Sequence, residues 1–219
     1  EPSGIFDMDE FFDALHEEPL DRWYQIGNVI AVVDAGLDEK MSEEADYILA
    51  SEVADAGCIV LSKTQEASEK SIESTVKHLN RALEAVHCKR KFGEDEIIRK
   101  DWEQFETEDF ERILNSGYIA EDYEKMSLDE KEVFKSLYFM DLEISGAELR
   151  DVAQKIMQDP ACGSVFRIKG FTQETDGSWT ELNATHHEIT QCPIAEGQKV
   201  IIVIGEQPDE EMIKKYLKA

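Results

Sequence analysis

Apolar residues in the first half of the chain alternate between short continuous runs and longer helical patterns. The runs Val29–Val33 and Cys58–Leu61 have the length of strands and are bounded by glycine and polar residues, which is typical of strands buried on both faces. Between such runs, apolar residues recur every three or four positions, as in amphipathic helices. Helices are expected near residues 7–18, 41–53, 66–86 and 105–114. This alternation predicts a parallel sheet with right-handed crossovers, to which Ile97–Ile98 adds a short strand.

The pattern changes after Gly117. Residues 118–133 are acidic and have little periodic apolar content, which predicts a linker or an exposed helix. From residue 134 onward, apolar and polar residues alternate, which is the mark of a sheet covered on one side only. One face of its first strand would carry Tyr138, Met140, Leu142 and Ile144.

The remaining elements of the second half complete an α+β domain. Ser145 is the expected cap of a helix, and the Asp176–Gly177 pair predicts a hairpin between a strand at 165–171 and one at 179–182. A strand at 200–204 closes the sheet, and Pro208 begins a last helix. The sequence thus predicts a larger α/β part at 1–117, an acidic linker at 118–133 and a smaller α+β domain at 134–219.

The charge of the chain excludes several classes of partner. Its 219 residues include 49 acidic and 23 basic ones, a formal net charge of -26, which disfavours binding to nucleic acids or to anionic membrane surfaces. No apolar run approaches the roughly 20 residues of a membrane-spanning helix. The scattered cysteines lack the spacing of a zinc site, and we interpret Cys58, Cys88, Cys162 and Cys192 as reduced thiols of a cytoplasmic protein. The first residue is Glu1, which suggests that upstream residues were removed or are not represented.

Polar residues at the ends of predicted strands are the candidates for chemistry. Ser62–Gln65 follows the strand 58–61, and ligands of open α/β sheets bind at such strand ends. The same four residues are equally compatible with capping a helix that begins at Glu66. His186 and His187 would point to opposite faces of a strand, so only one could join Cys192 in a metal site, and a surface role is favoured. Arg167 and Lys169 share one strand face, where they would grip a partner's carboxylate or pair with acids of the chain.

Four segments in the same order resemble the CobW family of P-loop GTPases, which are metal chaperones and cofactor-metal insertases. Glu1–Gly4 resembles the family's Glu-x-x-Gly segment, and Val29–Ala35 its following strand. Residues 54–63 are similar to the Ala-Asp pair that leads to the guanine-recognition loop. Val165–Phe171 resembles the Arg-x-Lys-Gly-Phe/Tyr strand of the C-terminal domain, with Trp179 across a hairpin. The resemblance implies a partial P-loop NTPase-type parallel sheet at 1–117 followed by the family's C-terminal α+β domain.

The resemblance also implies roles for individual residues. Glu1 would be catalytic and would hold Mg²⁺ through a water, and Gly4 would admit a backbone N–H to the terminal phosphate. Ser62, Lys63, Thr64 and Gln65 would contact the base of GTP. Gln65 stands where the family has an aspartate, so one guanine donor would meet an amide donor. This mismatch costs about 1–3 kcal/mol and would weaken selectivity for guanine over adenine.

The implied activity is GTP hydrolysis coupled to delivery of a metal, with Zn²⁺ or Co²⁺ as cargo. The partners would be the nucleotide and a client metalloprotein or metal-cofactor enzyme, and a homo-oligomer is compatible with this interpretation. The given sequence contains neither the Gly-Lys-Ser/Thr loop nor the Cys-x-Cys-Cys segment of the family, so we expect this chain alone to be incompetent in hydrolysis. The strand 29–33 would then have an exposed edge. The alternative is a non-catalytic module with a degenerate nucleotide site, whose C-terminal sheet binds a partner protein.

Overall fold

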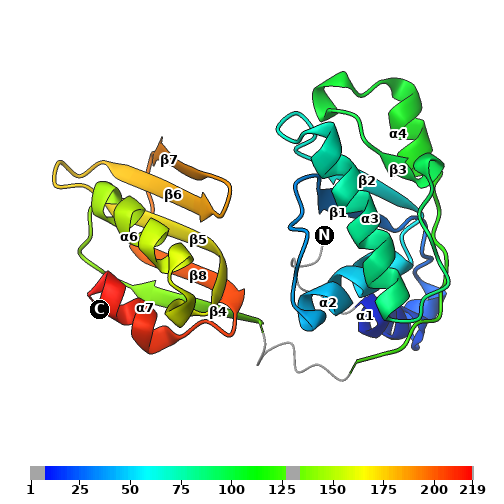
Figure 1. The fold of residues 1–219 in the computed structure, drawn as a ribbon, viewed down its shortest axis with the longest axis horizontal. Helices are drawn as coiled ribbons and strands as arrows, with labels where there is room; N and C mark the ends of the chain where they lie inside the picture. Colours follow the sequence, from blue (N-terminus) through cyan, green and yellow to red (C-terminus); the bar gives the residue numbers. More distant parts are fainter. Residues whose placement is uncertain (1–7, 127–133, 219) are drawn as a thin grey trace. The chain divides into compact units, whose positions relative to one another are not determined.

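The structure is a computed structural model that describes residues 8–126 and 134–218. The chain divides into two compact units, Glu1–Ser127 and Leu128–Ala219, each with a sheet of its own (Figure 1). One described sheet is parallel and the other antiparallel, so the predicted α/β class with a second α+β part is confirmed. The proposed linker lies partly outside the described residues, and its boundaries stay a prediction.

Unit 1 contains, within the described residues, a parallel sheet in the order β1-β2-β3. It consists of β1 (Ile30–Asp34), β2 (Cys58–Ser62) and β3 (Ile97–Ile98). All three were predicted from the apolar runs. The register pairs Asp34 with Ser62, so the carboxyl ends of β1 and β2 lie level and their polar residues meet at one edge of the sheet.

Two helices cover one face of this sheet. α2 (Glu43–Ala54) connects β1 to β2, and α3 (Glu69–Ala85) connects β2 to β3. Successive right-handed crossovers in one direction place both helices on the same side, and they pack against each other (Figure 1). The buried residues between helices and sheet include Val53, Ile59, Leu79 and Leu83.

Capping serines set where these helices begin. Ser42 Oγ accepts the backbone N–H of Ala45, and Ser68 Oγ accepts that of Ser71. Both helices therefore start two or three residues later than the apolar period suggested. Two further α-helices of this unit are α1 (Met8–His16), which packs on α2, and α4 (Thr107–Leu114). Short 3-10 turns lie at η1 (Leu20–Arg22), η2 (Glu94–Glu96) and η3 (Trp102–Gln104).

β1 is an edge strand of the described sheet, as predicted. Its side chains alternate between the helix-covered face, where Val33 is 6% exposed, and the opposite face, where Val32 is 68% exposed. A β-branched apolar side chain this open is unusual in a parallel sheet, which is normally covered on both faces.

Unit 2 has a five-stranded antiparallel sheet in the order β4-β8-β5-β6-β7. Its strands are β4 (Phe134–Met140), β5 (Ser164–Gln173), β6 (Trp179–Thr185), β7 (Ile189–Ile194) and β8 (Val200–Glu206). α6 (Gly146–Gln158) and α7 (Glu210–Leu217) pack on one face over a core that includes Leu149, Ile156, Ile168, Ile201 and Ile213 (Figure 1). The turn η4 (Pro160–Cys162) connects α6 to β5. The helix after Ser145 and the Asp176–Gly177 hairpin were predicted.

The prediction of which face of β4 is covered is wrong. Asp141 has a left-handed backbone with φ of 54° and ends the strand, so Leu142 and Ile144 lie beyond it. Tyr138 and Met140 are 64% and 45% exposed on the open face, while the neighbouring Phe139 is buried toward the helices. Side chains do alternate between the two faces of β4, but the face that carries Phe139 packs against the core, and the face that carries Tyr138 is open.

Gly170 sets how closely α6 approaches the sheet. A Cβ at this position of β5 would lie 2.3 Å from Cδ2 of Leu149, a fully buried residue of α6. The absence of a side chain therefore lets the helix pack directly on the strand.

The four cysteines are free thiols. Cys58, Cys88 and Cys162 are buried and Cys192 is exposed. Burial raises the pKa of each of the three buried thiols, so they remain protonated and pack as small apolar side chains. Among the described residues, no helix combines the length and apolar character needed to cross a membrane.

Candidate functional site

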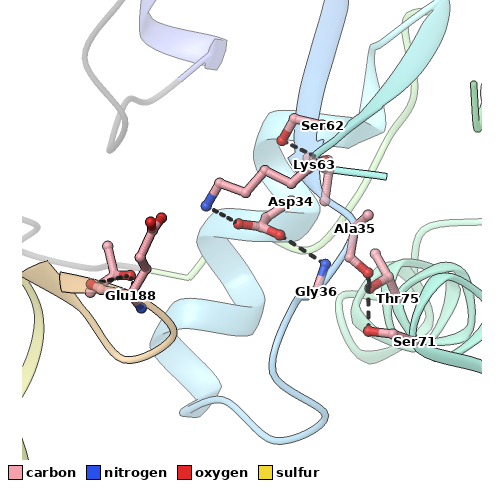
Figure 2. A network of polar contacts seen from close by, with 10 residues as sticks. Asp34, Ala35, Gly36, Ser62, Lys63, Ser71, Thr75 and Glu188 are labelled. Carbon is pink, nitrogen blue, oxygen red and sulfur yellow. Dashed lines mark hydrogen bonds and ion pairs between the residues drawn. The ribbon is translucent and has the colours of Figure 1, made fainter. Parts of the chain in front are cut away.

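The predicted ligand corner lies where β1 and β2 end side by side. The backbone N–H of Ala35 donates to the carbonyl of Ser62 at 2.9 Å, and Ser62 Oγ donates to the carbonyl of Val33 at 3.3 Å. These bonds hold the two strand ends together just before their loops diverge (Figure 2). Ser62 thus has a structural role in addition to the predicted contact with a base.

Lys63 is a side chain of this corner whose position is set by an ion pair. Its backbone is left-handed, with φ of 56°, a conformation uncommon for a residue with a side chain. Its Nζ lies 2.6 Å from Oδ2 of Asp34, the last residue of β1, while Oδ1 of Asp34 accepts the N–H of Gly36 at 2.8 Å (Figure 2). The carboxylate therefore fixes the lysine head and the turn after β1 at once. The Lys63 side chain is 48% exposed, so its stem remains open to a ligand.

Asp34 was not predicted to belong to this corner. The signal was available, because Asp34 follows an apolar run directly, and equivalent ends of adjacent parallel strands meet at one edge. Only the register, which pairs Asp34 with Ser62, brings it next to Lys63.

Thr64 and Gln65 form a turn rather than a helix cap. The N–H groups of Glu66 and Ala67 both donate to the Lys63 carbonyl, at 3.0 and 3.2 Å. Because Ser68 caps α3, the alternative that Ser62–Gln65 caps a helix beginning at Glu66 is wrong. Gln65 is exposed, and within the part of the chain that the structure describes its amide has no hydrogen-bond partner. It is therefore available to a ligand.

The loop after β1 is anchored to α3. Thr75 Oγ1 and Ser71 Oγ of α3 donate to the Ala35 carbonyl at 2.9 and 3.3 Å. Hydroxyl groups of one helix thus reach the residue next to Asp34, and this fixes the strand end from which the carboxylate projects.

A buried histidine ties the same loop to both helices. His78 of α3 is 1% exposed, with Nδ1 2.7 Å from the Asp38 carbonyl and Nε2 2.6 Å from Oδ1 of Asp46 on α2. Nδ1 must carry a proton, because a carbonyl only accepts. One buried side chain of α3 therefore contacts both Asp38 in the loop and Asp46 in α2.

The Ala54–Asp55 pair lies at the opposite end of β2 and does not reach this corner. Asp55 is 5% exposed; its Oδ1 accepts the N–H of Glu121 at 3.0 Å and its carbonyl accepts that of Ile119 at 3.1 Å. Buried Arg90 donates to the Ala54 carbonyl at 2.6 Å. The pair therefore shapes the fold. The predicted catalytic residues Glu1 and Gly4 lie outside the described residues.

Arg167 and Lys169 are bound to residues of the neighbouring strand β6. Arg167 Nε donates to Oδ1 of Asn183 at 2.7 Å, and Lys169 Nζ lies 2.9 Å from Oε1 of Glu181. Lys169 thus pairs with an acid of the chain, which is one of the two predicted roles. Arg167 instead binds a neutral amide.

The metal-site alternative at the histidines rested on a strand that is not there. His186 and His187 lie in the bend between β6 and β7, so strand alternation does not separate them, while Cys192 is an exposed residue of β7. No group of three or more His, Cys, Asp or Glu among residues 8–126 and 134–218 is arranged to hold a metal ion. The interpretation of the histidines as surface residues fits their exposure.

Unit 1 is therefore an α/β domain of the class that binds ligands at the carboxyl ends of parallel strands. Residues 1–92 match the family model of the CobW/HypB/UreG nucleotide-binding domain. This segment of the chain is similar to the nucleotide-binding domain of that family, and it contains β1, β2 and the whole corner around Lys63.

Two solved structures are similar to the chain. The Zn(II)-bound YjiA GTPase from E. coli matches with a TM-score of 0.36 and 17% sequence identity, over 98% of this chain and 68% of that chain. A Zn(II)-bound triple mutant of YjiA GTPase matches with the same TM-score and coverage at 16% identity. The comparison with curated proteins gave no match. The similarity to the family model covers residues 1–92.

Proposed function

We propose that the corner formed by Ser62–Gln65 and Asp34 recognises the base of a guanine nucleotide in a protein that couples nucleotide hydrolysis to metal delivery. The observation that carries the proposal is Lys63, held at the ends of β1 and β2 by Asp34 within the segment that matches a nucleotide-binding domain. A lysine fixed at its head presents its methylene stem as a flat apolar surface, which suits a purine ring.

Gln65 is the residue of this corner that would form hydrogen bonds with the edge of the base. Guanine presents two N–H donors on one edge, and a carboxylate would accept both. The amide of Gln65 offers one carbonyl oxygen and an NH₂ donor, so one guanine donor faces another donor. This mismatch costs about 1–3 kcal/mol. We therefore infer that the protein discriminates GTP from ATP less than a protein with an aspartate at this position does.

The phosphate and metal parts of the proposal rest on the family alone. Glu1 would hold Mg²⁺ through a water and Gly4 would let a backbone N–H approach the terminal phosphate. A Mg²⁺ ion held there would supply positive charge to stabilise the phosphates. The cargo would be Zn²⁺ or Co²⁺, passed to a client metalloprotein or metal-cofactor enzyme.

Titration of the protein with fluorescent GTP and ATP analogues tests the base corner. The ratio of the two dissociation constants should be small in the unaltered protein and should rise about tenfold in Gln65→Asp, since the carboxylate accepts both guanine donors. Gln25→Asp is the matched control, because Gln25 is exposed in a loop outside the corner. A protein that binds neither nucleotide overturns the proposal. A strong preference for GTP in the unaltered protein overturns the role given to Gln65 alone.

The runner-up is a non-catalytic interaction module, which is favoured by the open face of the sheet in unit 2. Tyr138 is 64% exposed on this face, and aromatic side chains are enriched at interfaces. If this interpretation holds, Tyr138→Lys abolishes capture of the client by the protein, and Gln65→Asp changes no measurable property.

A further inference from the structure

A polar pocket of about 290 Å³ lies in unit 2, between α6 and the bend that joins β6 to β7. Arg150, Gln154 and Gln158 line it from α6, and His186 and His187 line it from the bend. These residues belong to unit 2, whereas the base corner belongs to unit 1. The volume is at the lower end of the range for small-molecule sites, so the pocket suits a compact ligand.

The walls of this pocket are held by hydrogen bonds. In the bend, the N–H of Thr185 donates to the Glu188 carbonyl at 2.8 Å, and the N–H of Glu188 donates to Thr185 Oγ1 at 3.2 Å. Gln191 Nε2 of β7 donates to the Gly146 carbonyl at the start of α6 at 2.6 Å. These bonds fix the backbone of the bend and tie β7 to the start of α6, so the backbone around the pocket is in place before a ligand binds.

The basic side chains of the pocket make no ion pair or hydrogen bond with the described residues. Most lysines that show contacts in the described residues lie against a carboxylate, as Lys100, Lys169, Lys199 and Lys214 do. Arg150, His186 and His187 have no ion pair or hydrogen bond from their side chains to any described residue. In a chain with a net charge of -26, where acids are abundant, three unpaired groups of this kind around one hollow are unexpected.

The chemistry of these side chains selects an anion. A guanidinium only donates, in a fork that matches the oxygens of a carboxylate or a phosphate, and imidazole and amide N–H groups add further donors. A metal ion is disfavoured, because the described residues here offer no set of three ligands. Glu188 also lines the pocket, and its carboxylate disfavours an anion on its own side. We propose that this pocket binds a small oxyanion ligand, a metabolite with a phosphate or carboxylate group, through Arg150 and the two histidines.

Amide chemical shifts of the isotope-labelled chain, titrated with potassium phosphate, potassium citrate and potassium chloride, test the proposal. Phosphate or citrate should give saturable shifts at residues 150–158 and 185–189 that chloride at equal ionic strength does not give. Saturation by phosphate alone identifies a phosphate ligand, and saturation by citrate alone identifies a carboxylate. Equal shifts with chloride, or shifts confined to other regions, overturn the proposal.

Variants locate the ligand. Arg150→Gln should weaken binding about tenfold or more, because charge-assisted hydrogen bonds to an oxyanion are lost. His186→Gln combined with His187→Gln should weaken it further. Lys155→Gln is the matched control, since Lys155 is an exposed cation of the same helix that does not line the pocket. All these positions are exposed, so the variants should keep the amide spectrum elsewhere. Unchanged binding in Arg150→Gln contradicts the assignment.

Discussion

Gly170 of β5 offers a direct test of how the helix and the sheet of unit 2 fit together. In Gly170→Ala the new Cβ would lie 2.3 Å from Leu149 Cδ2 and 3.7 Å from Ile201 Cγ1. Leu149 is fully buried, so its methyl group has no open space to enter. Either this side chain leaves its rotamer or α6 lifts from the sheet. Overpacking of this kind costs about 1–3 kcal/mol of unfolding free energy.

A double-mutant cycle isolates the contact. Leu149→Ala alone should cost about 2–5 kcal/mol, because it leaves a cavity in the core. In that background the clash disappears, and Gly170→Ala should be neutral or stabilising by about 0.5–1 kcal/mol, since alanine loses less backbone entropy than glycine in a strand. The two substitutions are therefore strongly coupled, with opposite effects of Gly170→Ala in the two backgrounds.

Urea unfolding followed by the fluorescence of Trp179 gives the required free energies for unit 2. Trp23 and Trp102 are 72% and 68% exposed in unit 1, so both can be replaced by Phe at little cost to leave Trp179 of β6 as the reporter. If Gly170→Ala costs the same in the Leu149→Ala background as in the chain that keeps Leu149, the close approach of α6 does not explain this glycine.

Three further substitutions test other contacts by urea or thermal unfolding. Gly57→Ala should lower the unfolding free energy by more than about 3 kcal/mol, the upper end of ordinary overpacking. The new Cβ would lie 2.3 Å from the backbone oxygen of Gly117, which cannot rotate away as a side chain can. A smaller loss of unfolding free energy contradicts this. His78→Ala should cost about 1–3 kcal/mol in all, because it removes a buried ring and its hydrogen bonds to the Asp38 carbonyl and the Asp46 carboxylate, whereas a neutral result would show that water replaces the ring. Glu148→Gln should destabilise at neutral pH, because bonds from the backbone and then the side chain of Ser145 lower the pKa of Glu148. Such stabilisation is present above the unfolded pKa and disappears as the pH falls through the lower folded pKa, so the difference should vanish in acid; a constant difference contradicts it.

The parallel sheet of unit 1 was predictable because its strands are continuous apolar runs. Val29–Val33 and Cys58–Leu61 have the pattern of strands buried on both faces, and even the two-residue strand at Ile97–Ile98 stands out between polar neighbours. The starts of the helices were less predictable. The apolar period extends through the turn before α3, whereas the hydrogen bond from Ser71 to Ser68 decides where the helix begins.

The antiparallel sheet of unit 2 was predicted less well, because one of its faces is open and the other covered. Tyr138 and Met140 are apolar although they lie on the open face, so the alternation of β4 could be assigned to the wrong phase. β7 (Ile189–Ile194) was not predicted at all, since it carries Gln191 and Pro193. Its position at the edge of the sheet, beside β6, makes a proline tolerable there.

The candidate site was located by pattern, but its geometry required the register between strands. Ser62–Gln65 could be placed at a strand end from the sequence alone. The ion pair of Lys63 with Asp34 joins residues 29 positions apart, and no local signal specifies it. The pocket at Arg150 likewise depends on how a helix packs beside a bend that is distant in the sequence, where the histidines were expected on a strand.

If the corner binds a base as proposed, Asp34 and Gln65 have different roles in it, and two variants can separate these roles. Asp34 holds Lys63 Nζ through one oxygen and the N–H of Gly36 through the other, so it cannot replace the missing base-reading carboxylate without releasing the lysine. Asp34→Asn should therefore weaken GTP and ATP to the same extent, because it frees the stem that supports either purine. Gln65→Asp should change their ratio instead. If Asp34→Asn alters the ratio and Gln65→Asp does not, Asp34 reads the base and Lys63 must leave it when nucleotide binds.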